Sequence, residues 1–435
     1  MYLFQALFPN DEHQDGEIES GYLTRVILVL QTPRDYQYFV YFFDAAALRC
    51  PKYKSAIRVD IIILYSYPLS SFLTMFFNFN ILALLLLIPA SYATQPYSIW
   101  MSDSFMTRGV TADRHYANAV LYRGFELAYK KSGNATYYNY IKSQVDQFVD
   151  SAGNLGGDYS TSLFSLDDLR IGPNLLFLYQ STQDARYKTA AGQLRAQLDR
   201  QPRTPRGGFW HRSPDYPNQM WLDGIYMAEP FYAQWNQLFD ASNVTAWDDI
   251  ILQFDLIEEH CRNKTSNLLV HGYDESKVAV WADPVTGAAP HVWDRAVGWY
   301  FMALIDVLDY FPESHSGYAK LLGYMDSLAV GVKAAQDAAG GWWLVMDAPY
   351  PGMKGNYIES SATAMFTYSF LKAIRLGYID SATYLETAQK AYGLMTTKFV
   401  AQNGTNSTLN WEGTVVVGSL GSNATFEVIL FSFCS

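Results

Sequence analysis

The sequence predicts an all-α fold in which pairs of helices close into a toroid. From about residue 99 to residue 400, amphipathic helical patterns alternate with loops rich in Gly, Pro and aromatic residues. Strand signals are few, and no Gly-x-Gly-x-x-Gly follows one, so a dinucleotide-binding fold is not indicated. The patterns amount to eleven helices, one fewer than the two rings of an (α/α)6 barrel contain. An open solenoid of helix pairs is the alternative, although no fixed sequence period supports it.

The predicted helices follow one another with short connections. In chain order they cover residues 98–107, 114–131, 136–150, 165–181, 184–199, 219–236, 246–262, 291–310, 315–335, 358–375 and 381–398. Short apolar runs predict strands at 268–271, 278–281, 342–346 and 413–418. The twelfth helix of a closed barrel falls where residues 428–435 read VILFSFCS, an aberrant tail. We therefore expect the last helix to be missing or altered.

The N-terminal region is expected to lie outside the main domain. Residues 1–74 contain apolar runs without a sustained period, and we interpret them as a non-native extension. Residues 75–93 are interpreted as a signal peptide, because their apolar run is short and Ser91-Tyr92-Ala93 offers small residues for cleavage. A membrane anchor through residues 59–90 is the alternative. The main domain then covers residues 94–427.

Composition restricts the class of partner. The formal net charge is −11 and no block of Lys and Arg occurs, which argues against nucleic acid. The three cysteines lack metal-ligand spacing, so neither a metal nor a cofactor is expected, and a monomer is assumed. Sequons after a signal-like segment indicate a secreted, extracellular glycoprotein. These sequons begin at Asn134, Asn243, Asn263, Asn403, Asn406 and Asn423.

The strongest chemical signal lies in residues 207–234. Asp223 falls there in the first turn of a helix predicted to begin after Pro217. Burial among aromatic groups disfavours a charged carboxyl, so we expect Asp223 to have a raised pKa and to donate a proton. Aromatic faces also suit the apolar C–H face of a sugar ring. The aromatic residues of this stretch include Trp210, Tyr216, Trp221 and Tyr226.

Further clusters place polar groups beside aromatic residues or at helix starts. They cover residues 115–116, 165–173, 271–275, 293–299 and 356–361. In the second cluster, one carboxylate of the Asp167-Asp168 pair is expected only to cap a helix. Taken singly, each Trp of the fourth cluster is more readily explained as a core residue.

Together these motifs resemble those of the unsaturated rhamnogalacturonyl hydrolases, family 105 of the glycoside hydrolases. A more distant resemblance is to the unsaturated glucuronyl hydrolases. The segments that carry it are MWLDG, WDRAVGW, LDDLRIGP, HGYDES and YIESSATAMF, and it covers about residues 98–427. The resemblance implies an (α/α)6 barrel that needs no metal. It also implies removal of 4,5-unsaturated galacturonic acid from rhamnogalacturonan oligosaccharides, which are products of pectin degradation.

The resemblance further implies roles for single residues. Asp223 matches the proton donor, which protonates C4 of the C4=C5 enol ether so that water adds at C5 and the aglycone leaves. Asp167 matches the second catalytic-site carboxylate, whose charge is expected to raise the pKa of Asp223 further. Arg212 stands where the family often has Lys, and Arg binds a uronate carboxylate in bidentate fashion. The matched substrate-binding positions are Tyr116, Asp168, Arg212, His271, Trp293, Arg295 and Trp299.

Two other functions stay open on the residues alone. One is an unsaturated glucuronyl hydrolase that acts on glycosaminoglycan-type disaccharides. The other is a non-catalytic sugar-binding toroid, which the altered C-terminus motivates. The complete set of acids and arginines favours an enzyme over a binder.

Overall fold

The computed structural model describes residues 25–31, 38–44, 61–63, 95–404 and 407–431. The chain divides into two units, and residues 95–431 belong to the larger one. In the smaller unit, β1 (Arg25–Gln31), β2 (Tyr38–Asp44) and β3 (Ile61–Ile63) form an antiparallel sheet in that order. The predicted signal peptide, residues 75–93, lies outside the described residues.

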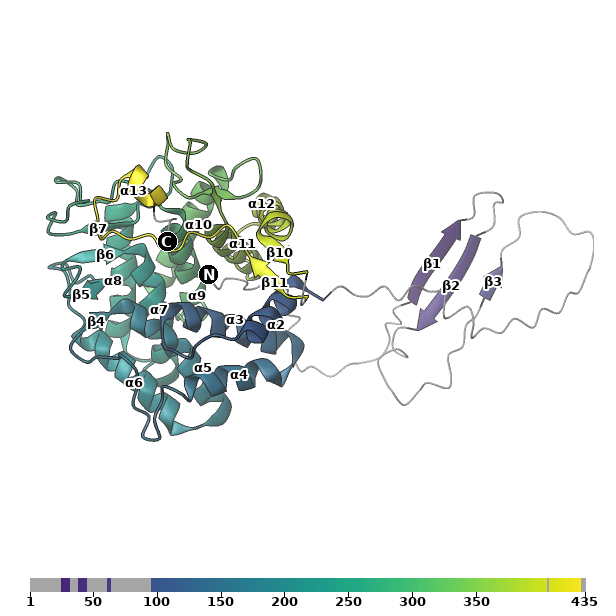
Figure 1. The fold of residues 1–435 in the computed structure, drawn as a ribbon, viewed down its shortest axis with the longest axis horizontal. Coiled ribbons are helices and arrows are strands. Elements are labelled where there is room, and N and C mark those ends of the chain that lie inside the picture. The colour runs from purple at the N-terminus through teal and green to yellow at the C-terminus, as the bar shows by residue number, and fades with distance from the viewer. Residues whose placement is uncertain (1–24, 32–37, 45–60, 64–94, 405–406, 432–435) are drawn as a thin grey trace, which may run out of the picture. The chain divides into compact units, whose positions relative to one another are not determined.

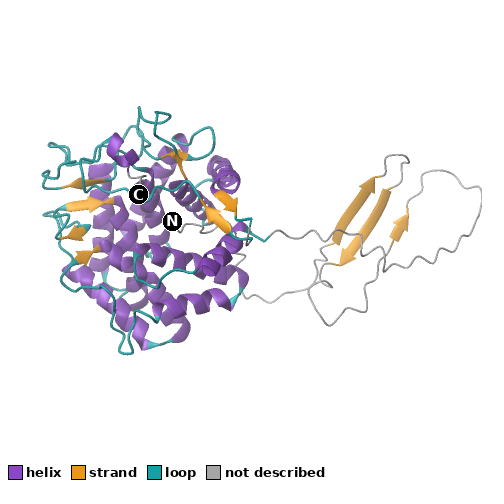
Figure 2. Ribbon diagram, viewed as in Figure 1, coloured by secondary structure: helices purple, strands orange, loops and turns teal. Residues whose placement is uncertain are grey.

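The larger unit is a succession of helix pairs, which confirms the predicted all-α class (Figures 1 and 2). Five long helices form its inner layer: α3 (Tyr116–Ser132), α5 (Gly172–Thr182), α7 (Leu222–Phe239), α9 (Asp294–Val307) and α11 (Ser360–Arg375). Each follows an outer helix in the chain: α2 (Tyr97–Arg108), α4 (Ala135–Val145), α6 (Ala185–Arg200), α8 (Val244–Cys261) and α10 (Ser316–Ala334). Helix α12 (Ser381–Leu394) packs against α11.

Burial distinguishes the two layers. Every residue of α9 is buried, and α9 packs against both α7 and α11, as expected for a helix that is apolar on all sides. The outer helix α6 instead buries one face, which includes Leu194 and Leu198, and exposes Arg200. The hydrophobic core therefore lies between the layers and around α9.

The last helix of the described residues is short. Helix α13 (Phe426–Phe431) has only six residues, and the ring of Phe426 stacks on Tyr350 with centroids 4.3 Å apart. Residues 432–435 lie outside the described part of the chain. None of the helices in the described residues combines the length and hydropathy that a membrane crossing requires.

Two of the predicted strands are wrong for a common reason. In residues 278–281 the amides of Val278 and Ala279 donate to the carboxylate of Asp274, at 2.8 and 2.7 Å. In residues 413–418 the amide of Val415 donates to Glu359 at 3.0 Å. Side-chain acceptors thus take the amides that a neighbouring strand would otherwise bind, and sequence periodicity cannot reveal such acceptors.

Short two-stranded ribbons hold the loops that lead into the inner helices. The strand β6 (Gln219–Trp221) directly precedes α7, and β9 (Ile358–Glu359) directly precedes α11. These ribbons fix where the inner helices begin. The strand pairs are β4 (Phe164–Ser165) with β5 (Arg212–Ser213), β6 with β7 (Gly272–Asp274), β8 (Trp342–Trp343) with β9, and β10 (Val400–Gln402) with β11 (Leu409–Trp411).

Candidate active site

Three of the predicted site residues lie at the N-terminal ends of inner helices. Tyr116 is the first residue of α3, Asp223 the second of α7 and Arg295 the second of α9. No side chain of a cap residue binds the N-termini of α3, α5 or α7, whereas in α9 the amide of Arg295 donates to Oδ1 of Asp294 at 2.7 Å. Uncapped N–H groups carry partial positive charge, so this end of the barrel favours an anion.

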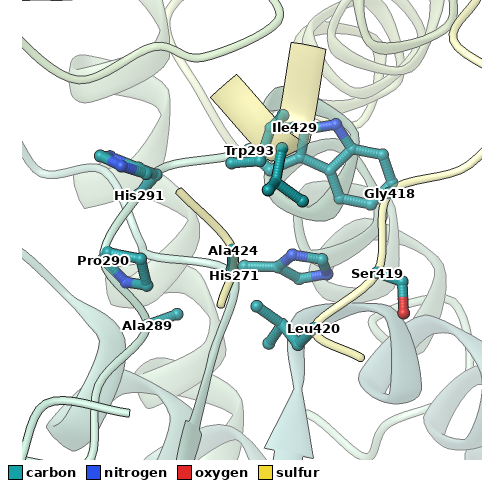
Figure 3. A pocket seen from close by; sticks show the side chains of 11 residues that line it. His271, Ala289, Pro290, His291, Trp293, Gly418, Ser419, Leu420, Ala424 and Ile429 are labelled. Atoms are coloured by element: carbon teal, nitrogen blue, oxygen red, sulfur yellow. The ribbon is translucent and has the colours of Figure 1, made fainter. Parts of the chain in front are cut away.

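Seven of the nine predicted site residues line one cavity of about 520 Å3, a volume that includes its open mouth. They are Tyr116, Asp167, Arg212, Asp223, Trp293, Arg295 and Trp299. His271 lines a smaller pocket that shares Trp293 with this cavity (Figure 3). It reaches the site through its hydrogen bond to Asp223. Asp168 lines neither of these two pockets.

Asp223 is paired with a histidine that is distant in the sequence. Its Oδ2 lies 3.0 Å from Nε2 of His271. Burial raises the pKa of Asp223, but the positive charge and the hydrogen bond of His271 outweigh burial, so the pKa is lowered from its ordinary value. The predicted raised pKa is therefore wrong for this arrangement. The sequence showed only the aromatic neighbours and not the pairing.

Asp167 is paired with Arg212 across the β4–β5 ribbon. A guanidinium nitrogen of Arg212 donates to Oδ2 of Asp167, and Nε2 of His211 lies 4.0 Å from the other carboxylate oxygen. The arginine balances the charge of this carboxylate. Burial lowers the pKa of His211, which favours a neutral ring.

Asp168 has a different environment from its neighbour. Its carboxylate accepts a hydrogen bond from Arg114, which also binds Asp158 at 2.6 Å. Neither Asp167 nor Asp168 caps a helix, because the cap position of the 166–171 turn is Ser165 and makes no side-chain bond. The expected helix cap is therefore wrong. The structure gives Asp168 a role in an ion pair beside the site, outside the cavity.

Aromatic rings form the walls of the cavity. Trp299 stacks on Tyr226 with ring centroids 5.0 Å apart. The guanidinium of Arg170 lies 4.4 Å from the centroid of the Tyr226 ring. On a second wall the ring of Trp221 stacks on His211 at 4.4 Å. Such flat, partly apolar surfaces can contact the C–H face of a sugar ring.

The sequence reasoning missed one segment of the cavity. Val417, Gly418 and Ser419 line it, although their sequence read as a strand far from the other motifs. Met227 also lines it, one helical turn beyond Asp223 on α7. The i, i+4 spacing from Asp223 was a usable signal for Met227, whereas no local pattern marked residues 417–419.

The cavity combines carboxylates, cations and ring surfaces at one end of a helical double ring. Within the described residues, no group of three or more His, Cys, Asp or Glu side chains is arranged to hold a metal ion. Acid–base groups beside stacking walls suit chemistry on a saccharide. Fold and site together define a six-hairpin carbohydrate-active enzyme.

Comparisons with known proteins agree with this class. The sequence model described as Glycosyl Hydrolase Family 88 matches residues 97–427. A solved structure of a Clostridium acetobutylicum glycoside hydrolase from family 105 is similar with a TM-score of 0.73 and 32% identity, over 77% of this chain and 93% of that one. The chain therefore belongs to glycosyl hydrolase family 88, and the predicted resemblance to family 105 is confirmed.

Two curated proteins are similar over shorter stretches. An Agrobacterium fabrum protein is 47% identical over 112 residues, which is 26% of this chain and 47% of the relative. The unsaturated rhamnogalacturonyl hydrolase YesR of Bacillus subtilis is 24% identical over 266 residues, which is 60% of this chain and 71% of YesR. The first of these matches spans about half of the relative's length.

Proposed function

We propose that this glycoside hydrolase removes 4,5-unsaturated galacturonic acid from the non-reducing end of rhamnogalacturonan oligosaccharides. One observation carries the proposal: Asp223 lies at an uncapped helix start in a cavity that also holds Arg212 and stacking rings. A cation and helix N-termini suit the uronate carboxylate, and the rings suit the sugar face. The similarity to YesR and to the family 105 structure supports the same substrate class.

Arg212 is the residue we assign to the uronate carboxylate. Its side chain is 37% exposed at the cavity, and its Nε is buried without a hydrogen-bond partner among the described residues. A partly exposed guanidinium that lines a cavity can donate to an entering carboxylate, and the planar group allows a bidentate contact. Asp167 accepts a hydrogen bond from Nη2 of this guanidinium and so orients it.

In the proposed reaction Asp223 delivers a proton to C4 of the enol ether. C5 becomes cationic and takes up water, and a proton of that water returns to the Asp223 carboxylate. The C5 hemiketal then opens to a ketone, and C1, now a hemiacetal, releases the aglycone as an alcohol. No covalent bond to the enzyme forms, so the separation rule for two-carboxylate glycosidases does not apply.

The lowered pKa of Asp223 has to rise before it can donate. A bound uronate supplies the cause, because a second negative charge nearby disfavours the ionised carboxylate. Nε2 of His271, 3.0 Å from Oδ2, is placed to exchange a proton with Asp223 at that moment. We therefore assign His271 a part in supplying the proton.

The test measures loss of the ultraviolet absorbance of the unsaturated ring. Purified protein is incubated with unsaturated galacturonosyl-rhamnose, and free rhamnose is quantified in parallel. The proposal predicts that absorbance falls as rhamnose appears in equal amount. Constant absorbance over many hours at several pH values would contradict it.

The same assay separates the alternatives. Unsaturated glucuronyl disaccharides of glycosaminoglycan type replace the substrate, and a larger kcat/KM on them favours the glucuronyl hydrolase. Calorimetric binding of the galacturonosyl disaccharide without turnover favours the sugar-binding toroid.

We also propose that the protein is a secreted glycoprotein. Asn134 and Asn263 are exposed, and each uses only its side-chain oxygen as an acceptor for nearby amides. The nitrogen that carries a glycan is therefore not used by these bonds. Peptide mass spectrometry of protein from the medium of a eukaryotic host, before and after deglycosylation, tests both points.

A further inference from the structure

Residues 415–419, here called the strap, cross the site without belonging to a helix or strand. Three of these residues line the active-site cavity. Figure 3 shows Gly418 beside the ring of Trp293, with Ser419 and Leu420 on the side of His271. The strap thus separates the cavity from the smaller pocket next to it.

The backbone of the strap at Gly418 packs directly against the ring of Trp293. A Cβ atom added at Gly418 would lie 2.4 Å from Cζ2 of the Trp293 ring, well inside van der Waals contact. Any other residue at this position has to displace the strap or the ring, and the ring is buried. The absence of a side chain at Gly418 therefore fixes the width of the cavity on this side.

Glu359 anchors the strap from behind. The side chain of Glu359 is fully buried at the start of α11. Its Oε1 accepts the amide of Val415 at 3.0 Å and Nη2 of Arg295 at 3.2 Å. Its Oε2 accepts the amide of Ala362 at 2.8 Å and so caps the helix. One carboxylate joins the strap, α9 and α11.

Arg295 completes the anchor. Its Nη2 donates to the carbonyl of Val415, its Nη1 to the carbonyl of Val416 at 3.4 Å, and its Nε to Ser361 at 2.8 Å. Burial and the charge of Glu359 raise the pKa of the neighbouring acid Asp294 well above the ordinary value. Glu359 is the carboxylate that forms the ion pair with Arg295, at 3.2 Å from Nη2.

We infer that Glu359 is a positioning residue of the active site. Through Arg295 and the amide of Val415 it holds the strap against Trp293, and the strap forms one wall of the substrate cavity. The guanidinium of Arg295 is part of this anchor and also lines the cavity. The expected change in KM rests on the proposed function. The expected change in hydrogen exchange at residues 415–419 does not depend on it.

The experiment compares Glu359→Gln with the full-length wild-type protein. A carboxamide has no charge and one acceptor oxygen, so the ion pair with Arg295 is lost and the amide of Val415 or of Ala362 faces an NH2 group. We expect the KM for unsaturated galacturonosyl-rhamnose to rise about tenfold while kcat changes less than about threefold. Hydrogen exchange at residues 415–419 should become about tenfold faster.

Gly418→Ala displaces the strap without touching Glu359 and should raise KM in the same way. The matched control is Thr367→Val, a buried isosteric change on α11 that removes a hydroxyl donating to the carbonyl of Thr363, and it should alter neither KM nor exchange. The inference fails if strap exchange is unchanged in Glu359→Gln, or if Thr367→Val changes it equally. If the wild-type protein does not turn over the substrate, only the proposed function is contradicted, because the hydrogen-exchange comparison needs no substrate.

Discussion

Replacement of Asp223 by Asn isolates the proton that this residue is proposed to donate. Asn has nearly the same shape, and its oxygen can still accept from Nε2 of His271 across the 3.0 Å contact. The side chain is largely buried, so little space opens and the local packing is retained. The change therefore removes a charge and an acidic proton while leaving the wall of the cavity in place.

The expected loss is in kcat. A positioned general acid contributes about 10²–10⁴ in rate, which corresponds to about 3–5 kcal/mol of barrier. KM should stay the same or fall, because removal of the Asp223 charge also removes its repulsion of the uronate carboxylate. A rise in KM at constant kcat would instead identify a binding role.

The matched control lies on the same helix. Glu229 on α7 is 1% exposed, lies outside the cavity, and has one carboxylate oxygen without a partner in the described residues. Burial raises its pKa well above the ordinary value, which favours the protonated form, and Gln keeps the shape of that form. Glu229→Gln should keep wild-type kcat and unfolding midpoint. If Asp223→Asn keeps more than about a tenth of wild-type kcat, the proton-donor assignment is refuted.

Three further changes test other contacts. His271→Gln removes the charge that lowers the pKa of Asp223. The pH above which kcat/KM declines should therefore rise. A decline that begins at lower pH would contradict the pairing. Arg212→Lys keeps the charge but loses the planar group, so KM should rise about tenfold at similar kcat, and an unchanged KM would exclude the uronate contact. Lys372→Met removes the Nζ that lies 2.8 Å from Asp306, so this buried carboxylate loses its ion-pair partner, which should cost about 3–5 kcal/mol in urea unfolding. Adding Asp306→Asn to Lys372→Met should recover much of the lost free energy of unfolding. If nothing is recovered, the ion pair between Lys372 and Asp306 is not the cause of the loss.

Local patterns in the sequence were sufficient to predict the order of the helices and the position of Asp223. Amphipathic periodicity depends on which face of a helix is buried, and it placed eleven helices in the right order. Asp223 was placed correctly in the first turn of α7 because the start of a helix is encoded within a few residues. The motifs around it also identified the family, since they preserve residue types together with their spacing.

Contacts between distant segments were decided only by the tertiary structure. The pairing of Asp223 with His271 reverses the expected direction of its pKa shift, and the two residues are 48 positions apart. The adjacent acids Asp167 and Asp168 separate into different ion pairs because the backbone turns between them. The strap reads as a strand, yet buried side chains from α9 and α11 take up its polar groups. Sequence periodicity reports which face of a segment is buried, whereas the partner that satisfies each charge and each amide is set by the packing of the whole barrel.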